Sequence, residues 1–225
     1  MSRDARQKSL IPPERLAKTH ALVVGVGAVG RQVALLLGAT GVPSITLVDP
    51  DTVQDVNLGP QMYPEYAVDR DKVDVTAGTI YDLNPHTSVV EYKERFLRRR
   101  AKEYLRCADG FETSVFCCVD SISARRRVWE SVRDHCYFFV DGRVGGETVR
   151  VITGGVHYED TLFDESEAFV GSCTAKMTGY LAAVTAGLML AQWSKHLRQL
   201  PLDPDLTLDV LGTDLILPEK SHAPT

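Results

Sequence analysis

The stretch ALVVGVGAVGRQV, residues 21–33, decides the fold of this chain. An apolar run leads into Gly25-x-Gly27-x-x-Gly30, and helix-forming residues follow directly. Glycines at this spacing allow a tight turn, close approach of the backbone to a phosphate, and close packing of a helix on a strand. The stretch therefore predicts the first strand, turn and helix of a nucleotide-binding βαβ unit. NAD and ATP both remain open, because each carries phosphates and a ribose.

Apolar runs and amphipathic segments alternate through the first two thirds of the chain, which predicts an α/β fold. We expect a Rossmann-like, doubly wound and mostly parallel sheet with helices on both faces. The predicted strands are 19–26, 44–50, 88–96, 114–120, 136–144 and 148–155, with one more at 206–211. The predicted helices are 31–39, 72–82, 98–107, 124–135 and 175–196.

The 225 residues fit a single domain, 1–225, more economically than two. We divide it into an N-terminal arm (1–18), a nucleotide-binding core (19–156), a mobile loop followed by an interface helix (157–197), and a C-terminal tail (198–225).

Composition excludes several classes of protein. The apolar fraction of 44% and the charged fraction of 24% are typical of soluble globular chains. The net charge of −5 disfavours a nucleic-acid binder, which is usually basic. The chain shows no export signal, and its most apolar stretch, Gly179–Trp193, is too short to span a bilayer. Five cysteines, an odd number, then indicate reduced thiols and a cytoplasmic location.

The loop after the second predicted strand carries the residues that bear on the choice of nucleotide. VDPDTVQDVNLGPQ places Asp49, Asp51, Asn57 and Gln61 in one loop, and Lys72 opens the next helix. An acid at the strand end suits a ribose, and an amide and a lysine suit a polyphosphate. The loop holds no group suited to hydride transfer.

These residues resemble the ThiF/MoeB/HesA family, the bacterial relatives of ubiquitin-activating enzymes. That family has an Asp-x-Asp-x-Val segment, an Asn-Leu-x-Arg-Gln box and a lysine at a helix start. The matching residues here are Asp49, Asp51, Val53, Asn57, Leu58, Gln61 and Lys72. The resemblance implies ATP and Mg²⁺ as cofactors, a homodimer, and adenylation of the C-terminal carboxylate of a small ubiquitin-like or sulfur-carrier protein that ends in Gly-Gly.

The resemblance extends to two more segments. CCVDSISARRRV, from Cys117, is similar to the family's Cys-x-Asp-x-x-x-x-Arg segment, which implies that Asp120 lies near the ATP phosphates and Mg²⁺. A helix cap is an equally simple role for this acid. Near the N-terminus, Arg6-Gln7 matches a pair that family members present to the active site of the other subunit, which makes Arg6 a candidate catalytic residue.

One position departs from the family. Pro60 stands where the Asn-Leu-x-Arg-Gln box has its arginine, so a cation for the phosphates is missing. Either another cation takes its place, with Arg6, Arg70 and Arg143 as candidates, or the chain binds phosphate more weakly.

Cys173 is the predicted nucleophile. The segment GSCTAKMTGYLAAVTAGLMLAQ resembles the family segment in which a cysteine captures the activated carboxyl group as a thioester or takes part in sulfur transfer. Ser172, Thr174, a helix start and Lys176 surround the thiol and favour a reactive thiolate. The alternative is a cysteine that only caps the helix, whereas Cys117 and Cys118 lie in an apolar strand and read as inert core thiols.

Three other functions stay open. A NAD-dependent oxidoreductase accounts for the glycine turn and Asp49 but leaves the loop from Asn57 to Lys72 unexplained. A tRNA-modifying relative would adenylate a small carboxylate instead of a carrier protein. A catalytically impaired module, in which Pro60 has ended phosphate chemistry, would still bind a partner protein.

Overall fold

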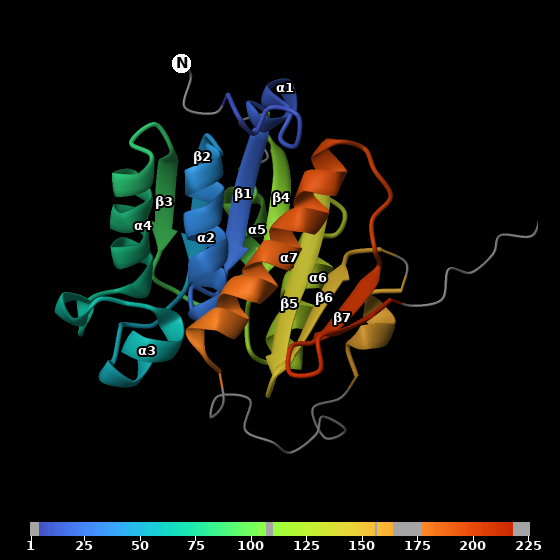
Figure 1. The fold of residues 1–225 in the computed structure, drawn as a ribbon. Coiled ribbons are helices and arrows are strands. Elements are labelled where there is room, and N and C mark those ends of the chain that lie inside the picture. Colours follow the sequence, from blue (N-terminus) through green and yellow to red (C-terminus); the bar gives the residue numbers. More distant parts are fainter. Residues whose placement is uncertain (1–4, 107–109, 156, 164–176, 218–225) are drawn as a thin grey trace, which may run out of the picture.

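The computed structural model describes residues 5–106, 110–155, 157–163 and 177–217. Within them the chain forms one eight-stranded sheet with helices on both faces, so the α/β fold prediction is confirmed (Figure 1). The strands are β1 (Thr19–Val24), β2 (Ser44–Val48), β3 (Ser88–Tyr92), β4 (Glu112–Cys117), β5 (Phe138–Gly145), β6 (Thr148–Thr153), β7 (Asp205–Asp209) and β8 (Asp214–Ile216). The α-helices are α1 (Pro13–Leu16), α2 (Ala28–Thr40), α3 (Leu58–Gln61), α4 (Lys72–Leu83), α5 (Ala101–Tyr104), α6 (Ile122–Val132) and α7 (Gly179–Leu197). Short 3₁₀ helices are η1 (Asp55–Asn57), η2 (Glu65–Ala67), η3 (Arg98–Arg100) and η5 (Glu159–Thr161).

The sheet has a parallel half and an antiparallel half. Its strand order is β3-β2-β1-β4-β5-β6-β7-β8. The first five strands pair in parallel, and β6, β7 and β8 continue the sheet through antiparallel pairs. Val24 lies opposite Val48 on one side and Cys117 on the other, so β1, β2 and β4 end together. Their carboxyl ends, at the bottom of Figure 1, form the edge where parallel α/β folds bind ligands.

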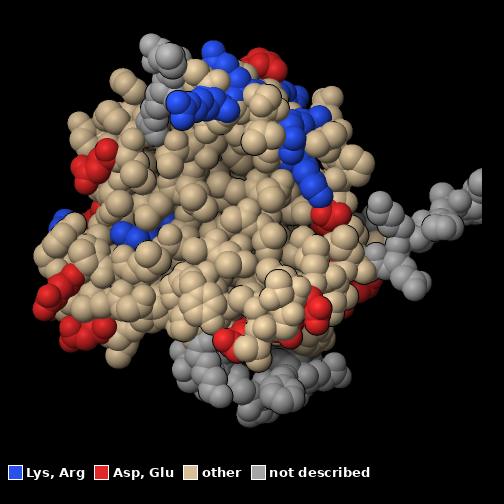
Figure 2. Space-filling model, viewed as in Figure 1, with Lys and Arg blue, Asp and Glu red and all other residues tan. Residues whose placement is uncertain are grey.

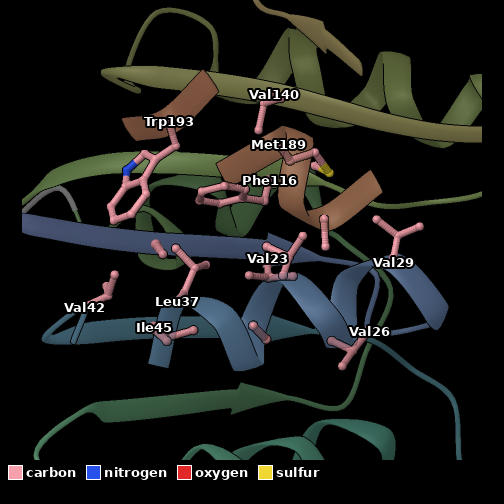
Figure 3. Close-up of a cluster of buried hydrophobic side chains, with 14 of the residues drawn as sticks. Val23, Val26, Val29, Leu37, Val42, Ile45, Phe116, Val140, Met189 and Trp193 are labelled. Atoms are coloured by element: carbon pink, nitrogen blue, oxygen red, sulfur yellow. The ribbon is translucent and has the colours of Figure 1, made fainter. Parts of the chain in front are cut away.

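Burial explains why the first strand can be so apolar. All six residues of β1 are buried, because helices cover the sheet on both faces. On one face α2, α4 and α7 pack over the sheet, and Figure 3 shows Leu37, Phe116 and Trp193 meeting in this layer. On the other face α5 and α6 enclose a second cluster around Val115 and Trp129.

Several predicted boundaries need correction. The helix predicted from Arg31 begins at Ala28, because Gly27 is already its N-cap residue, and it ends as expected at Gly41 in the left-handed region. The helix predicted over 98–107 is shorter and less regular than predicted: η3 and α5 follow one another directly over residues 98–104. Arg100 there bonds to Glu94 and Glu103, and the backbone of Arg106 takes a positive φ of 49°. The Arg100–Glu103 pair lies within this helical stretch, and the left-handed residue at position 106 follows its end.

The end of the described chain also differs from the prediction. The strand predicted at 206–211 is present as β7, but β8 was not predicted, because DLI is too short to show a period. The predicted interface helix is α7; its first two predicted residues lie outside the described ranges. No helix in the described ranges combines the length and the apolar character needed to cross a membrane.

Candidate active site

The glycine turn closes against the end of β4. Gly25 has a φ of +85°, and a Cβ atom there would lie 2.7 Å from the carbonyl oxygen of Cys118. A Cβ on Gly30 would collide with the carbonyl oxygen of Gly25. Gly27, the N-cap of α2, faces open space up to the Gln61 side chain, whose Oε1 is 4.0 Å from the Cβ position. The three glycines therefore have the steric roles that the sequence predicts, and Gly27 leaves the helix N-terminus accessible.

Asp49, the residue after β2, forms a hydrogen bond with the glycine turn. Its carboxylate accepts hydrogen bonds from the backbone N–H of Val26 at 2.6 Å and of Asp51 at 2.9 Å. The residue is buried, and burial raises the pKa of the carboxyl group. A carboxylate has about four acceptor positions, so two stay free for the hydroxyl groups of a ribose.

Lys72 lies buried at the first position of α4. Its Nζ donates to Asp51 Oδ2 at 3.1 Å, and its backbone N–H donates to the carbonyl oxygen of Asp51 at 3.0 Å. The Lys72 side chain is 7% exposed, whereas that of Asp51 is 61% exposed. Lys72 is therefore a buried cation whose acid partner is largely exposed to solvent.

The segment between Asp51 and Lys72 contains η1 and α3. Asn57 Oδ1 accepts from the backbone N–H of Gln54 at 3.0 Å, so part of its amide serves a local cap. Gln61 Oε1 is buried and has no hydrogen-bond partner within the described ranges. Pro60 is half-buried between these two residues and offers no donor.

Asp120 follows the end of β4, beside the glycine turn. Its side chain is exposed and makes no hydrogen bond or ion pair with the described residues. The N-cap of α6 is Ser121, whose hydroxyl accepts from the backbone N–H of Ala124 at 3.2 Å. The helix-cap role that the sequence left open for Asp120 thus belongs to Ser121.

The arginine of the same segment has a structural position. Arg125 forms a buried ion pair with Asp141, which is fully buried on β5. Arg143 binds the same carboxylate at 2.7 Å and also the carbonyl oxygen of Thr161, and the Tyr158 hydroxyl donates to Asp141 at 3.1 Å. This network fastens η5 to the sheet, and it occupies Arg143, which cannot then replace the cation absent at position 60.

The other two candidates for the cation absent at position 60 are Arg6 and Arg70. Gln7 Nε2 donates to the carbonyl oxygen of Thr40 at 2.7 Å, which places Arg6 at the amino ends of the strands, opposite the glycine turn (Figure 1). One chain does not bring Arg6 to its own site. Arg70 is exposed, two residues before Lys72, and its side chain has no bonded partner among the described residues.

Cys173 lies outside the described residues, which resume at Met177. Where they resume, a Cβ atom on Gly179 would lie 3.0 Å from Met62, so α7 begins against the loop that follows α3. The thiols of Cys117 and Cys118 are enclosed and burial raises the pKa of each, while burial raises the pKa of Cys136 to about 11. These three cysteines are protonated at neutral pH, as expected of core thiols.

Two residues beside the glycine turn, Arg31 and Tyr63, were not predicted from the sequence. Arg31 is buried in the first turns of α2, and its guanidinium lies 4.7 Å from the centre of the Tyr63 ring. The Tyr63 hydroxyl donates to the carbonyl oxygen of Val26 inside the glycine turn at 2.8 Å. A signal was available, because Arg31 shares a helix face with Ala34 and Gly38, both of which are buried.

The chain is similar in sequence to curated adenylyltransferases. Over 112 residues the chain is 33% identical to the adenylyltransferase and sulfurtransferase uba4 of Aspergillus clavatus, covering 49% of this chain and 22% of that protein. It is 28% identical over 116 residues to the sulfur carrier protein ThiS adenylyltransferase of Escherichia coli K12, covering 51% and 45%. The chain thus spans less than half the length of these curated relatives.

Solved structures share the fold. PaaA superposes with a TM-score of 0.73 at 19% identity, covering 90% of this chain and 64% of that one. E. coli MccB, in a crystal structure with ATP, superposes with a TM-score of 0.68 at 16% identity, covering 94% and 68%. The model of the ThiF family matches residues 6–217. This match includes the glycine turn, the loop from Asp49 to Lys72 and Asp120, and the chain therefore belongs to the ThiF family.

Proposed function

We propose that this protein is an ATP-dependent adenylyltransferase that activates the C-terminal carboxylate of a small ubiquitin-like or sulfur-carrier protein ending in Gly-Gly. The observation that supports this most is the set of groups around the glycine turn: Asp49, Lys72 and an unpaired Asp120, each at the carboxyl edge of the parallel strands. The names of the relatives uba4 and ThiS adenylyltransferase point the same way.

Each group has a role in binding ATP. The free backbone N–H groups at the N-terminus of the 13-residue helix α2 would receive the phosphates. Asp49 would accept from the ribose hydroxyls, while Lys72, Asn57 and Gln61 would surround the polyphosphate. Asp51 keeps the Lys72 ammonium in place until the nucleotide arrives.

Mg²⁺ fits the donor set at Asp120. Magnesium prefers one or two carboxylates together with phosphate oxygens and water, and Asp120 is an exposed carboxylate without a bonded partner in the described part of the chain. When bound, the ion would neutralise charge on the phosphates.

The reaction is a displacement at phosphorus. A carboxylate oxygen of the carrier attacks the α-phosphorus, a new C–O–P bond forms, and pyrophosphate leaves with the electron pair of the broken P–O bond. Positioning would supply the catalysis, together with charge neutralisation by Lys72 and by the Mg²⁺ that Asp120 would hold. Cys173 would then attack the acyl-adenylate, form a thioester and release AMP.

The proposal includes a homodimer in the cytoplasm, in which Arg6 of each copy reaches the site of the other. The uncharged face over α2 and α7 is where the copies would meet (Figure 2). On it Ala183, Gly187 and Ala191 are exposed on one side of α7, so a second helix could approach closely.

Pyrophosphate exchange tests the activity. The full chain is incubated with ATP, Mg²⁺, labelled pyrophosphate and, in turn, the Gly-Gly-terminated ubiquitin-fold proteins of its own genome. We expect one of them to drive incorporation of label into ATP, and the same carrier without its last two glycines to be inactive. Tight carrier binding without exchange would instead identify the catalytically impaired module.

A further inference from the structure

Among the residues that the structure describes, Arg31 is a buried cation without a counter-charge. The residue is only 5% exposed, and its Nε is buried with no hydrogen-bond partner. No carboxylate of the described residues forms an ion pair with it, and burial lowers the pKa of the guanidinium. Its contact is the ring of Tyr63, 4.7 Å away. Burying an unpaired charge is costly, so the position calls for an anion.

The surroundings of Arg31 lead to the glycine turn. Tyr63 is itself anchored there, because its hydroxyl donates to the carbonyl oxygen of Val26 at 2.8 Å and lies 3.2 Å from Thr76 Oγ1. Arg31 is one turn beyond Gly27, and its backbone N–H bonds to the Gly27 carbonyl oxygen. Gln61 Oε1, also buried and unpartnered, faces the same glycine.

Arg31 Nε on α2 and Gln61 Oε1 on α3 are thus both buried without a partner among the described residues, and both lie near the N-terminus of α2. The N-terminus of a long helix itself favours an anion. The chain lacks a cation at position 60, next to Gln61. Of the replacements considered from sequence, Arg143 is held by Asp141, and Arg6 lies at the opposite edge of the sheet.

We propose that Arg31, stacked on Tyr63, is the phosphate-binding cation of this site and takes over the role of the arginine absent at position 60. The inference rests on the proposed function, since it assigns one more residue to the same ATP site. Arg31 is a binding residue here: it contacts the polyphosphate and takes no part in proton transfer.

Titrations with ATP and with adenosine test this assignment on the full chain. A charge-assisted hydrogen bond is worth enough that Arg31→Met should weaken ATP binding by roughly 10- to 100-fold. Adenosine has no phosphate, and its affinity should change less than about twofold. The melting temperature of the nucleotide-free Arg31→Met protein should equal or exceed that of the wild type, because an unpaired buried charge is removed. Arg127→Met, on the exposed side of α6, is the matched control and should change neither affinity.

Arg31→Gln is made in parallel, so that a neutral variant is measured even where one of the two fails to fold. The assignment is overturned if the folded variant binds ATP within about twofold of the wild type, if adenosine affinity falls as far as ATP affinity, or if Arg70→Met loses ATP binding instead. A wild-type protein that binds no ATP would refute the proposed function itself, whereas ATP binding that is indifferent to Arg31 would refute only this inference.

Discussion

At the scale of single residues, the site is built from groups that the backbone holds in place before a ligand arrives. Val26 and Asp51 each donate a backbone hydrogen bond to Asp49, and Asp51 holds the ammonium of Lys72. Such preorganisation lowers the reorganisation that a reaction has to undergo. Asp120 is the exception, because it is exposed and unpaired, and this is the condition expected of a carboxylate that acts on a ligand.

The first residue-scale prediction compares Asp120 with its neighbour. Asp120→Ala should reduce pyrophosphate exchange by on the order of 10²–10³, because one source of charge stabilisation is lost, with little change in stability. Ser121→Ala should behave oppositely: it removes the N-cap of α6 and lowers the free energy of unfolding by about 1 kcal/mol but keeps the exchange activity. Exchange at near wild-type rate in Asp120→Ala would remove Asp120 from the site.

The second residue-scale prediction concerns Cys173. Adenylate formation uses ATP, Mg²⁺ and a carboxylate, but no thiol, whereas a thioester requires one. Cys173→Ala should therefore keep pyrophosphate exchange and lose any thiol-sensitive adduct with the carrier on a non-reducing gel. Cys136→Ala is the control, because burial keeps that thiol protonated. A wild-type protein that forms no adduct, or an adduct that persists in Cys173→Ala, would make Cys173 structural.

At the scale of elements, the sequence predicts best where side-chain burial and backbone geometry agree. The strands β1, β2 and β4 were predicted because both faces of the parallel sheet are covered, which leaves uninterrupted apolar runs. The helix predicted over 98–107 ends earlier, after Tyr104, because Arg106 takes a left-handed conformation, and no glycine at that position signals it. Arg31 lies on an apolar helix face that the sequence already shows, but only the packed structure shows that its Nε has no hydrogen-bond partner among the described residues.

The element-scale prediction is that α7 forms the dimer interface. Gly187 is exposed on this helix, and a Cβ atom there would meet nothing within 4 Å in the single chain. Gly187→Glu should leave the monomer folded and shift the protein from dimer to monomer in light scattering, because the close approach is blocked and a charge is introduced. Gly78→Glu on α4, equally open in the single chain, is the control and should stay dimeric. A Gly187→Glu protein that remains dimeric would place the interface elsewhere.

At the scale of the whole molecule, one sheet contains every strand from β1 to β8. The candidate site lies at the carboxyl ends of its parallel strands. α7 crosses the face of the sheet between the site loop at Met62 and the far end at Phe138, where His196 lies 5.1 Å from the Phe138 ring. A group in the last turn of this helix can therefore report on the stability of the fold while staying remote from the nucleotide.

His196 makes that stability depend on pH. Burial, helped by Arg15, lowers its pKa below the ordinary value, against a smaller opposite effect of Glu112. The unfolded chain thus binds more protons than the native one below about pH 6.5, and the free energy of unfolding should rise with pH through this range. His196→Gln should flatten this part of the curve in urea titrations between pH 5 and 7.5. An unchanged slope in the variant would assign the dependence to other groups.

The nucleotide that the glycine turn accepts decides the function of the protein, and calorimetric titration of the full chain with ATP and with NAD measures this most directly. In the presence of Mg²⁺, ATP should bind saturably with one site per chain, and NAD should give no saturable heat, because the loop from Asn57 to Lys72 provides for a polyphosphate and offers nothing to a nicotinamide. Tight binding of NAD with no binding of ATP would contradict the account and restore the oxidoreductase reading.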